Sequence, residues 1–492
     1  MSRRLEGFRK VTGSAVYTAD VRLPGLAHAR LLLSPHARAT ILGIDLRSTR
    51  EVPGVLTAVA GEDLPELPVP AAEQPLARGV VAFSGQPVAA VVAETEAAAA
   101  DAIARIEVDY EPSPAVVDLE AAIESEGRAR QLTSILRGDP AAALAAAPLR
   151  VRGRYLAAPV HQAPLETRVA LARPERDGSA TVWASSQGVF TARDRTAAAL
   201  GVPAGRPLFV PTAIGGGFGL KLRPLIEPLL VLLAWRTGRP VRLVLTRSED
   251  FLLGRGAPAA AVDIEVGADR DGRLLALDLR AHLDVGAAPA GTGAPALVAV
   301  TGAYRIPDVA ASLHEVVTDK PPVGSYRAPA APQLFFALES ALDELSLQLG
   351  ADPIELRLLN ASREGDLRPD GKAWPAIGLV ECLRAAREHE LYTRPPGPGE
   401  TVGVAAGGIL GGVQPGSASC RLDSDGSLVV QLGAVDVAGT DTSLALLAAR
   451  VFDVGLDQVR VESGDTRTAP YSGAAAGSKV VYTCLLYTSP SP

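Results

Sequence analysis

One stretch organises the chain: Gly215-Gly216-Gly217-Phe218-Gly219-Leu220-Lys221. It follows the apolar run Leu208–Val210 and precedes Leu225–Trp235, an apolar segment of helical length. Three successive glycines at such a strand-to-helix junction can take positive φ and leave backbone N–H groups bare. We therefore expect either a concave site for an anion, helped by the positive end of the next helix, or a flexible hinge.

The composition is that of a folded protein with several domains. The chain has 492 residues, of which 47% are hydrophobic and 21% charged. This length predicts about two to four domains. A net charge of −7 and an aromatic content of 4% argue against a surface for nucleic acid or for an anionic membrane. We expect neither nucleic acid nor a membrane as a partner.

The cysteines argue for a reducing compartment. Cys382, Cys420 and Cys484 lie far apart and show none of the close spacings of a zinc or iron–sulfur site. Three cysteines also do not suggest a disulfide framework. The first residues lack the apolar core of an export signal, and no uninterrupted apolar run is long enough to span a bilayer. A cytoplasmic location is expected.

Residues 9–114 are predicted to form a compact domain of short strands with one helix. The helix is expected over the alanine-rich stretch Ala97–Arg105. Strand-like runs bounded by Pro, Gly and Asp occur at Leu31–Leu33, Val55–Val59, Val88–Val92 and Ile106–Val108. Residues 115–150 are interpreted as a connector, in which Ala141–Ala147 is either a short helix or part of a linker.

Residues 151–375 and 376–483 alternate strands with helices. Val262–Val266 has the two-residue period of a strand and leads through an Asp-Gly turn into Leu274–Leu279, which predicts a hairpin. Leu334–Leu349 predicts an amphipathic helix that ends at Gly350. Further strands are expected at Ala180–Trp183, Val241–Leu245, Ser427–Val430 and Val459–Val461, and a helix at Leu444–Phe452. The tail 484–492 differs in character and is interpreted as foreign to the rest.

Several motifs occur in a recognisable order. They are Val11–Asp20, the glycine stretch, Tyr326-Arg327-Ala328-Pro329 with Pro332-Gln333, and Asp352–Arg357 with Asn360. Together they resemble the molybdopterin-binding large subunit of the xanthine dehydrogenase and aldehyde oxidase family of molybdenum hydroxylases, from about Arg9 to Thr483. The resemblance implies an α+β fold: an N-terminal α/β hammerhead domain, then molybdopterin-binding α/β domains of which the last is incomplete.

This resemblance also implies an activity and partners. Members of the family hydroxylate an electrophilic carbon with water as the oxygen source, using a molybdopterin-type molybdenum cofactor that in some carries a cytosine nucleotide. The chain has no cysteine pattern for clusters and no flavin motif. An iron–sulfur subunit and an FAD subunit are therefore expected as partners, in a dimer of heterotrimers when complete.

Particular residues acquire roles from the resemblance. Phe218 and Gly219 match the loop that lies over the molybdenum, with Gly216 and Gly217 allowing close approach of the backbone. Gln187 occupies the position of a glutamine that donates to the metal's oxo ligand, a task that suits an uncharged amide.

Two further segments match family positions. Arg327 resembles an arginine beside the active site, where its rigid donor fork is apt. Gly477-Ser478-Lys479-Val480 resembles a turn whose main-chain N–H groups hold the cofactor. His161 and Glu166 also match a family pattern, but we interpret them as a packed, hydrogen-bonded turn. No residue of this chain is expected to bind the metal directly.

Departures from the pattern bear on the substrate. Leu222 and Pro295 replace a glutamate and an arginine of the purine-oxidising branch, and Pro329 replaces a phenylalanine that stacks on the purine. Ala328 replaces the cysteine that carries copper in the carbon-monoxide branch. Xanthine and carbon monoxide are therefore not expected as substrates. A substrate pocket lined by Leu222 and Pro329 suits an aldehyde or an uncharged aromatic heterocycle.

Two departures bear on activity. Gly439, within Asp436–Thr442, stands where relatives have a glutamine that contacts the cofactor. The family's general base is a glutamate in a Gly-x-Gly-Glu motif, and none follows Thr483. We expect the chain to be the N-terminal part of a longer enzyme, without a catalytic residue of its own and poorly soluble alone. The alternatives are an inactive cofactor-binding module and, less favoured, a nucleotide-binding protein that uses the glycine stretch.

Overall fold

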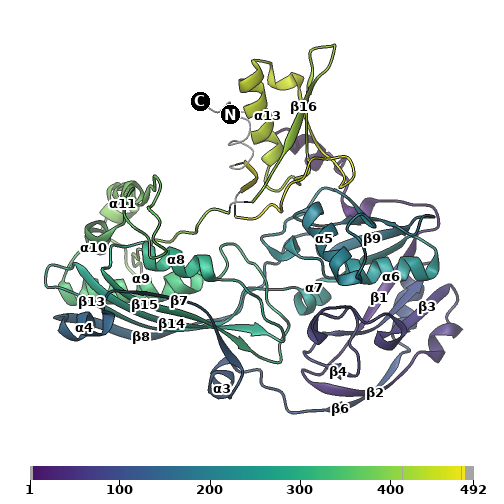
Figure 1. Cartoon of the computed structure of the whole chain (residues 1–492), viewed down its shortest axis with the longest axis horizontal. Helices are drawn as coiled ribbons and strands as arrows, with labels where there is room; N and C mark the ends of the chain where they lie inside the picture. The colour runs from purple at the N-terminus through teal and green to yellow at the C-terminus, as the bar shows by residue number, and fades with distance from the viewer. Residues whose placement is uncertain (1–3, 413, 478, 482–492) are drawn as a thin grey trace.

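The computed structural model describes residues 4–412, 414–477 and 479–481, so Ser478 and the tail 484–492 lie outside it. Figure 1 shows two large sheets side by side, with a smaller module of the C-terminal region standing above them. Helices pack on these sheets, and parallel and antiparallel pairings are mixed. The expected fold class, α+β with an N-terminal α/β part, is confirmed.

A seven-stranded sheet joins strands from two separate parts of the sequence. Its order is β11-β10-β9-β12-β1-β5-β3. The strands are β1 (Ala27–Leu33), β3 (Val55–Ala60), β5 (Pro87–Ala93), β9 (Val169–Pro174), β10 (Ala180–Ala184), β11 (Pro207–Val210) and β12 (Val241–Val244). Ala27 of β1 lies opposite Val241 of β12 in parallel pairing. The predicted domain boundaries at residues 114 and 150 therefore do not separate two sheets. The domain bounds themselves stay a prediction.

Apolar helices cover this sheet. α5 (Val189–Leu200) and α6 (Glu227–Thr237) contribute to its core, and α7 (Arg247–Leu253) follows β12. Leu229, Leu230 and Leu233 of α6 are fully buried. The predicted alanine-rich helix is α2 (Glu96–Ile103), which lies against β1 and β5. A small sheet of β2 (Ala39–Asp45), β4 (Val80–Val81) and β6 (Glu107–Pro112) completes this half.

A five-stranded sheet, in the order β7-β15-β14-β13-β8, forms the other half. Its strands are β7 (Ala129–Arg137), β8 (Leu149–Ala157), β13 (Ala260–Ala268), β14 (Leu274–Gly286) and β15 (Asp308–Val317). The predicted hairpin is β13–β14, closed where Asp269 N donates to Arg273 O over 3.0 Å. The expected connector supplies β7 with α3 (Leu119–Glu124) and α4 (Pro140–Ala146), so its alanine run is a helix.

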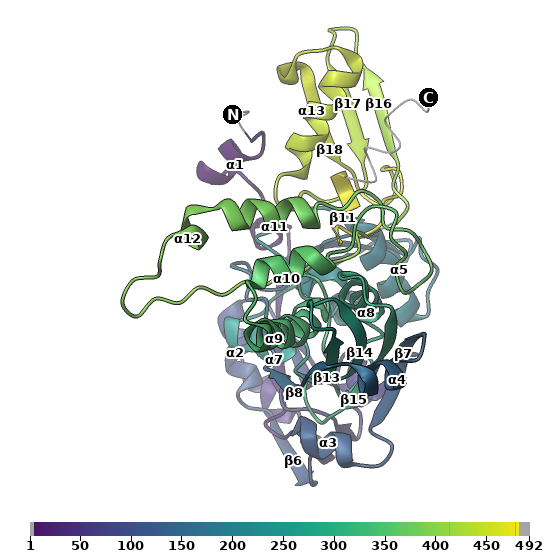
Figure 2. The same cartoon turned by 90° about the vertical axis from the view of Figure 1, so that its left-hand side faces the viewer.

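Helices pack against the five-stranded sheet, as Figure 2 shows for α8 (Ala294–Gly302) and α9 (Ala331–Leu349). α10 (Pro353–Asn360) packs on α9. The predicted amphipathic helix is α9, and Gly350 ends it with a left-handed φ of 63°. α11 (Leu379–Glu388) packs on α10, and the short helix α12 (Glu390–Thr393) follows it. Among the residues that the structure describes, none of the helices has the length and apolar character needed to cross a bilayer.

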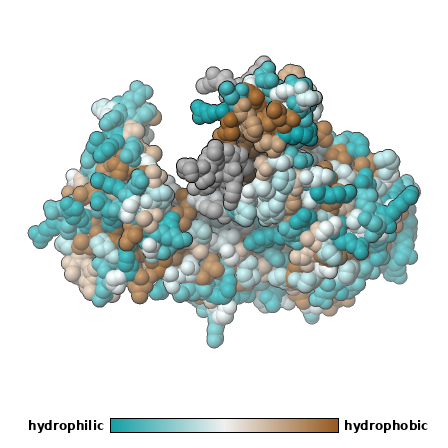
Figure 3. All heavy atoms as spheres, turned by 45° about the horizontal axis from the view of Figure 1, so that its top comes forward, coloured by the Kyte–Doolittle hydropathy of each residue, from teal (hydrophilic) through white to brown (hydrophobic). Residues whose placement is uncertain are grey.

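In the part that the structure describes, the upper module is built on a three-stranded sheet and the helix α13 (Thr440–Phe452). β16 (Ala418–Leu422), β17 (Leu428–Leu432) and β18 (Val459–Ser463) form its sheet, against which α13 packs. Figure 3 shows hydrophobic surface on this module. Its exposed apolar side chains include Leu422, Leu446, Val451 and Phe452. At the start of the chain, α1 (Gly7–Val11) lies near α13, since Leu5 N donates to Thr442 Oγ1 over 2.9 Å.

A buried ionic group joins α9 to α10. Arg357 is fully buried, and its guanidinium donates to Glu339 Oε2 and Asp343 Oδ1 over 2.7 and 2.8 Å. Glu339 also accepts the hydroxyl proton of buried Tyr304 over 2.7 Å. Burial raises the pKa of Tyr304, and the Glu339 carboxylate raises it further.

Removing one partner of this group should destabilise the chain. Glu339→Gln leaves Arg357 buried with a weakened countercharge, so we expect the free energy of unfolding to fall by about 3 kcal/mol. Chemical denaturation followed by circular dichroism measures the loss. Glu355→Gln, which breaks an exposed pair with Arg387, is the control and should behave like the parent. Equal effects of the two changes would contradict the assignment.

Candidate functional site

The glycine stretch is a loop rather than the cap of a helix. It leaves β11 at Val210 and ends in a 3₁₀ turn, η5 (Leu220–Leu222), whereas α6 begins only at Glu227. The N–H groups of Leu225 and Ile226 donate to Glu227 Oε2 over 2.7 and 3.0 Å. The prediction that the N-terminus of the next helix contributes to an anion site is therefore wrong. The helix α6 starts six residues after Lys221, and the Glu227 carboxylate accepts from the two N–H groups that precede it.

Close packing explains the glycines. A Cβ on Gly215 would lie 2.4 Å from Glu166 Cβ, and one on Gly217 would lie 2.5 Å from Gln187 Oε1. A Cβ on Gly219 would lie 2.3 Å from Ser325 O, and its φ of 107° also disfavours a side chain. The loop is thus held on three sides, which argues against the hinge alternative.

A buried ion pair joins the two ends of the glycine loop. Lys221 is buried, and its Nζ donates to Glu166 Oε2 over 2.7 Å and to Glu166 O over 2.9 Å. The same Oε2 accepts from Gly215 N over 2.9 Å. Burial lowers the pKa of Lys221, while the Glu166 carboxylate opposes that shift. One carboxylate therefore holds both ends of the glycine stretch.

Gln187 connects this loop to the C-terminal segment. Its Oε1 accepts from Gly219 N over 2.9 Å, and its Nε2 donates to Ala475 O over 3.0 Å. The backbone repeats the link, since Gln187 N donates to Lys221 O and Ala475 N donates to Gln187 O. Only one of the two hydrogens on Nε2 is used in these contacts. Gln187 and residues 216–219, predicted from separate motifs, thus lie together.

Arg327 meets the same loop through its backbone. Its N–H donates to Phe218 O over 3.0 Å. Its guanidinium is exposed and has no acceptor among the described residues. Leu222 and Pro329, the predicted lining of the substrate pocket, are both half-buried.

Backbone strain gathers around these residues. Six non-glycine residues in the described part of the chain have positive φ, and four of them belong to this region. They are Ala163, Phe218, Ala328 and Ala330, with φ of 44°, 53°, 64° and 63°. Such strain persists where packing enforces it and is typical of functional sites. Sequence reasoning missed the three alanines because alanine carries no signal for positive φ.

The predicted C-terminal turn packs against a neighbouring segment. Gly477 O accepts from Gly412 N over 3.0 Å, and Lys479 Nζ donates to Pro415 O over 3.3 Å. Lys479 N donates within the turn to Ala476 O, so it is not a free donor. Val480 is buried in the core of the upper module. Ser478 lies outside the described residues.

The backbone N–H groups of the glycine loop that have no protein acceptor suit an anionic ligand. The N–H groups of Gly216, Gly217 and Phe218 have no acceptor within the described residues, and the backbone N–H of Arg327 donates to Phe218 O of the same loop. Consecutive free N–H groups of this kind bind anions such as oxo and phosphate groups. The residues present therefore fit a cofactor that carries such groups.

His161 has a structural role here. Its Nδ1 accepts from Ala163 N and its Nε2 donates to Asp250 O, each over 3.0 Å. Burial lowers its pKa, which favours this neutral form. The prediction of a packed turn is confirmed, and no group of three or more His, Cys, Asp or Glu side chains in the described part of the chain could hold a metal ion.

The backbone conformation at Gly439 favours glycine. The residue begins α13 with φ of 86°, and a Cβ there would lie 2.3 Å from Arg4 Nη2. Next to it, Asp441 has one buried carboxylate oxygen without a partner in the described structure. Burial raises the pKa of Asp441 to about 7, and the Asp436 and Glu6 carboxylates contribute.

Comparison with known proteins agrees with this arrangement. Residues 12–114 match the aldehyde oxidase and xanthine dehydrogenase a/b hammerhead domain. Residues 123–361 and 384–485 each match a molybdopterin cofactor-binding domain. The chain therefore belongs to the xanthine dehydrogenase and aldehyde oxidase family of molybdenum hydroxylases, which are oxidoreductases.

Individual relatives extend over nearly the whole chain. The xanthine dehydrogenase molybdenum-binding subunit of Escherichia coli O157:H7 is 31% identical, over 97% of this chain and 69% of its own length. The nicotine 6-hydroxylase large subunit of Paenarthrobacter nicotinovorans is 28% identical, over 97% of this chain and 65% of its own. Among solved structures, quinoline 2-oxidoreductase from Pseudomonas putida 86 superposes with a TM-score of 0.85 at 28% identity, covering 99% of this chain and 70% of its own.

The packing of Gly219 predicts a large effect of adding one methyl group. Gly219→Ala combines positive φ with a clash against Ser325 O, so we expect a loss of about 3 kcal/mol in the free energy of unfolding. Gly201→Ala has φ of 65° but open space around the Cβ, and it should cost about 1 kcal/mol. Denaturant titration of both variants checks the difference, and similar losses would show that packing is not the reason.

The carboxyl of Asp441 predicts a dependence on pH. Its folded-state pKa of about 7 exceeds the ordinary value of 3.8, so the folded chain binds this proton more tightly than the unfolded chain. The stability that the protonated Asp441 carboxyl contributes is then lost as pH rises from about 4 to about 7. Asp441→Asn should therefore stabilise the chain at pH 8 and change little at pH 4, as measured by thermal melts. The exposed Asp457→Asn is the control, and a pH-independent effect of Asp441→Asn would refute the assignment.

Proposed function

We propose that this chain is the molybdenum-cofactor-binding subunit of a hydroxylase that oxidises an aldehyde or an aromatic N-heterocycle. Water is the oxygen source, and electrons pass to separate iron–sulfur and FAD subunits. The observation that carries the proposal is the meeting of the glycine loop, Gln187 and Arg327, which are 140 residues apart at their extremes.

Particular groups would hold the cofactor. The N–H groups of Gly216, Gly217 and Phe218 and the second amide hydrogen of Gln187 are available to its oxygen atoms, and Arg327 adds a fixed positive charge. Gly219 keeps this backbone in place by its bond to Gln187 Oε1. When bound, the cofactor supplies the redox chemistry of carbon hydroxylation. Holding Gln187 through Ala475 also fixes how the second amide hydrogen is oriented.

The turn formed by Gly477, Ser478, Lys479 and Val480 would hold the other end of the cofactor, with Lys479 and Val480 supporting the turn and not acting as donors to the ligand. In support, residues 473–477 reach the site through Ala475, which bonds Gln187 twice. The buried Lys479 donates to Pro415 O and so positions the turn instead of reaching the ligand with its side chain. Phe218 is 47% exposed and carries a strained backbone, as expected of a residue that a ligand would cover.

The residues beside the site favour a neutral reacting group. Leu222, Pro295 and Pro329 offer no charge where a purine would need one, and Ala328 offers no thiol for copper. Identity does not separate the substrate classes, since relatives named for nicotine and quinoline share 28% of residues and one named for xanthine shares 31%. The substrate proposal therefore rests on the residues beside the site. An aldehyde or heterocycle is therefore the proposed substrate, in preference to xanthine or carbon monoxide.

The proposed setting is a cytoplasmic dimer of heterotrimers. Cys382 and Cys420 are unpaired and exposed, which is compatible with a reducing compartment. The exposed apolar side chains of the upper module offer surface for further protein to cover. No catalytic base is assigned within this chain.

A second candidate function is an inactive cofactor-binding module. Gly439 favours it, because this position lacks a side chain and the Arg4 guanidinium occupies the adjoining space. The two functions differ in turnover and not in cofactor binding.

The direct test is purification of the complex with its metal content and substrate range measured together. We expect molybdenum to be bound and a panel of aldehydes and azaheterocycles to include a substrate. Chemical release of the cofactor identifies the proposed cytosine dinucleotide form. Turnover of xanthine alone would refute the substrate proposal, and molybdenum without any turnover would favour the inactive module.

Arg327 gives a specific prediction. Arg327→Met removes an exposed, unpartnered guanidinium, so folding should be unaffected while kcat/KM or the molybdenum content falls by about ten- to a hundredfold. Arg152→Met removes an exposed arginine from β8 and is the control. If both variants keep the parent's molybdenum content and kcat/KM, Arg327 has no part in the site.

A further inference from the structure

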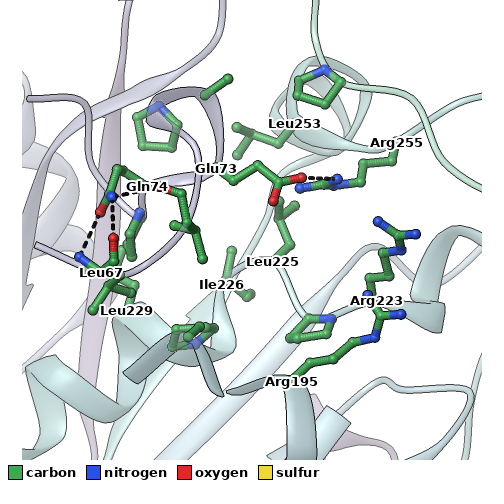
Figure 4. A pocket seen from close by; sticks show the side chains of 18 of the residues that line it. Leu67, Glu73, Gln74, Arg195, Arg223, Leu225, Ile226, Leu229, Leu253 and Arg255 are labelled. Carbon is green, nitrogen blue, oxygen red and sulfur yellow. Dashed lines mark hydrogen bonds and ion pairs between the residues drawn. The ribbon is translucent and has the colours of Figure 1, made fainter. Parts of the chain in front are cut away.

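A pocket beside the glycine loop gathers three arginines around a single carboxylate. Arg195 comes from α5, Arg223 follows the turn η5, and Arg255 follows α7, while Glu73 comes from the N-terminal half. Figure 4 shows the three guanidinium groups on one side of the pocket, with Glu73 reaching Arg255. The cavity is about 250 Å³ in volume.

These positive charges are not fully balanced. Arg255 Nη1 pairs with Glu73 Oε1 at 2.7 Å, but the buried Arg255 Nε has no partner within the described residues. The Arg223 side chain donates to a neutral carbonyl, Ala290 O, over 3.3 Å. Arg195 has no acceptor among the residues described. The lining therefore carries three cations against one anion.

The pKa of Arg223 reports the same imbalance. Burial lowers it, and the positive charges of Arg195 and Arg255 lower it further, while Glu73 acts in the opposite direction. Like charges kept this close in a partly buried pocket would be stabilised by a bound anion. A guanidinium fork is suited to the two oxygens of a carboxylate or to those of a phosphate.

The remaining walls are apolar except for Gln74, whose amide already donates to Leu67 O and Val69 O. The apolar walls include the side chains of Leu31, Phe83, Leu225, Ile226, Leu229 and Leu253. A ligand that satisfies both kinds of wall is a small molecule with an apolar body and an anionic end. The apolar walls and small volume favour an organic acid over a free, fully hydrated phosphate.

The pocket shares its supports with the glycine loop. Gln162 Nε2 donates both to Arg255 O over 2.9 Å and to Ser325 O over 2.8 Å, the oxygen against which Gly219 packs. On the other side, Arg168 donates to Leu220 O and to Arg223 O. Arg223 directly follows Leu222, the residue proposed to face the substrate.

We propose that Arg195 and Arg223, with Arg255, bind a carboxylate of the substrate. The substrate is then an aldehyde or N-heterocycle that also carries a carboxylate, with its neutral reacting part near Leu222 and its charged part in the arginine pocket. This inference rests on the proposed function and narrows its substrate class.

Binding to the purified complex tests the inference without turnover. Benzoate and benzamide share a ring and differ in charge, so isothermal titration with each isolates the carboxylate. We expect benzoate to bind more tightly than benzamide, and the double change Arg195→Gln with Arg223→Gln to weaken benzoate by about tenfold or more while sparing benzamide. Arg152→Gln, which removes an exposed charge on β8, should alter neither.

Three results would overturn the inference. One is equal binding of benzoate and benzamide, and another is benzoate binding that the double change leaves intact. The third is inorganic phosphate that binds more tightly than benzoate and displaces it, which would make this a phosphate site. Thermal melts of the variants exclude misfolding as the cause of a loss.

Turnover by the same preparation separates this inference from the proposed function. Pyridine-3-carboxylate should be preferred to pyridine-3-carboxamide, and the double change should abolish that preference. If the complex contains molybdenum and turns over neutral heterocycles without preferring the carboxylate, the carboxylate-binding inference is wrong and the proposed function stands. If the complex binds benzoate through these arginines but contains no molybdenum, the proposed function is wrong. The bound carboxylate can then no longer be assigned to a substrate of that function.

Discussion

The candidate site depends on the buried ion pair between Lys221 and Glu166. Glu166 Oε2 accepts from Lys221 Nζ and from Gly215 N, so one carboxylate oxygen fastens the two ends of the glycine loop. Because both charges are removed from water, neither can lose the other without leaving a buried charge uncompensated. This constraint keeps the loop tight enough for its glycines to touch Glu166, Gln187 and Ser325.

The strain at the site follows from that packing. Phe218 and Ala328 keep positive φ because the loop is bonded on either side of them, through Gly219 to Gln187 and through Arg327 to Phe218 O. Gln187 Nε2 donates one hydrogen to Ala475 O and thereby joins the C-terminal segment to the loop. The molecule thus places free N–H donors at a fixed position, which suits a ligand that needs rigid anchoring.

Much of the fold was predictable from local patterns. The β13–β14 hairpin, α9 with Gly350 at its end, and α13 all follow from periodicity and turn residues, and the structure confirms them. Several features of the site were not predictable. The helix after the glycine loop begins at Glu227, two residues later than the apolar run Leu225–Trp235 suggests, and Glu227 bonds the N–H groups of the two residues before it. Positive φ at Ala328 and Ala330 has no counterpart in the sequence, since alanine seldom adopts it.

By itself, the sequence determined the class of fold and the family, because ordered motifs and periodic apolar residues depend on neighbours along the chain. The site residues that it marks stay a prediction. Only the tertiary structure decided that β1 pairs with β12, that Gln187 holds the loop to Ala475, and that three arginines share one pocket. Arg195, Arg223 and Arg255 are unremarkable in the sequence, and each could have been a solvated surface charge. Their convergence depends on how α5, the turn η5 and the end of α7 pack around the seven-stranded sheet, which no local pattern encodes.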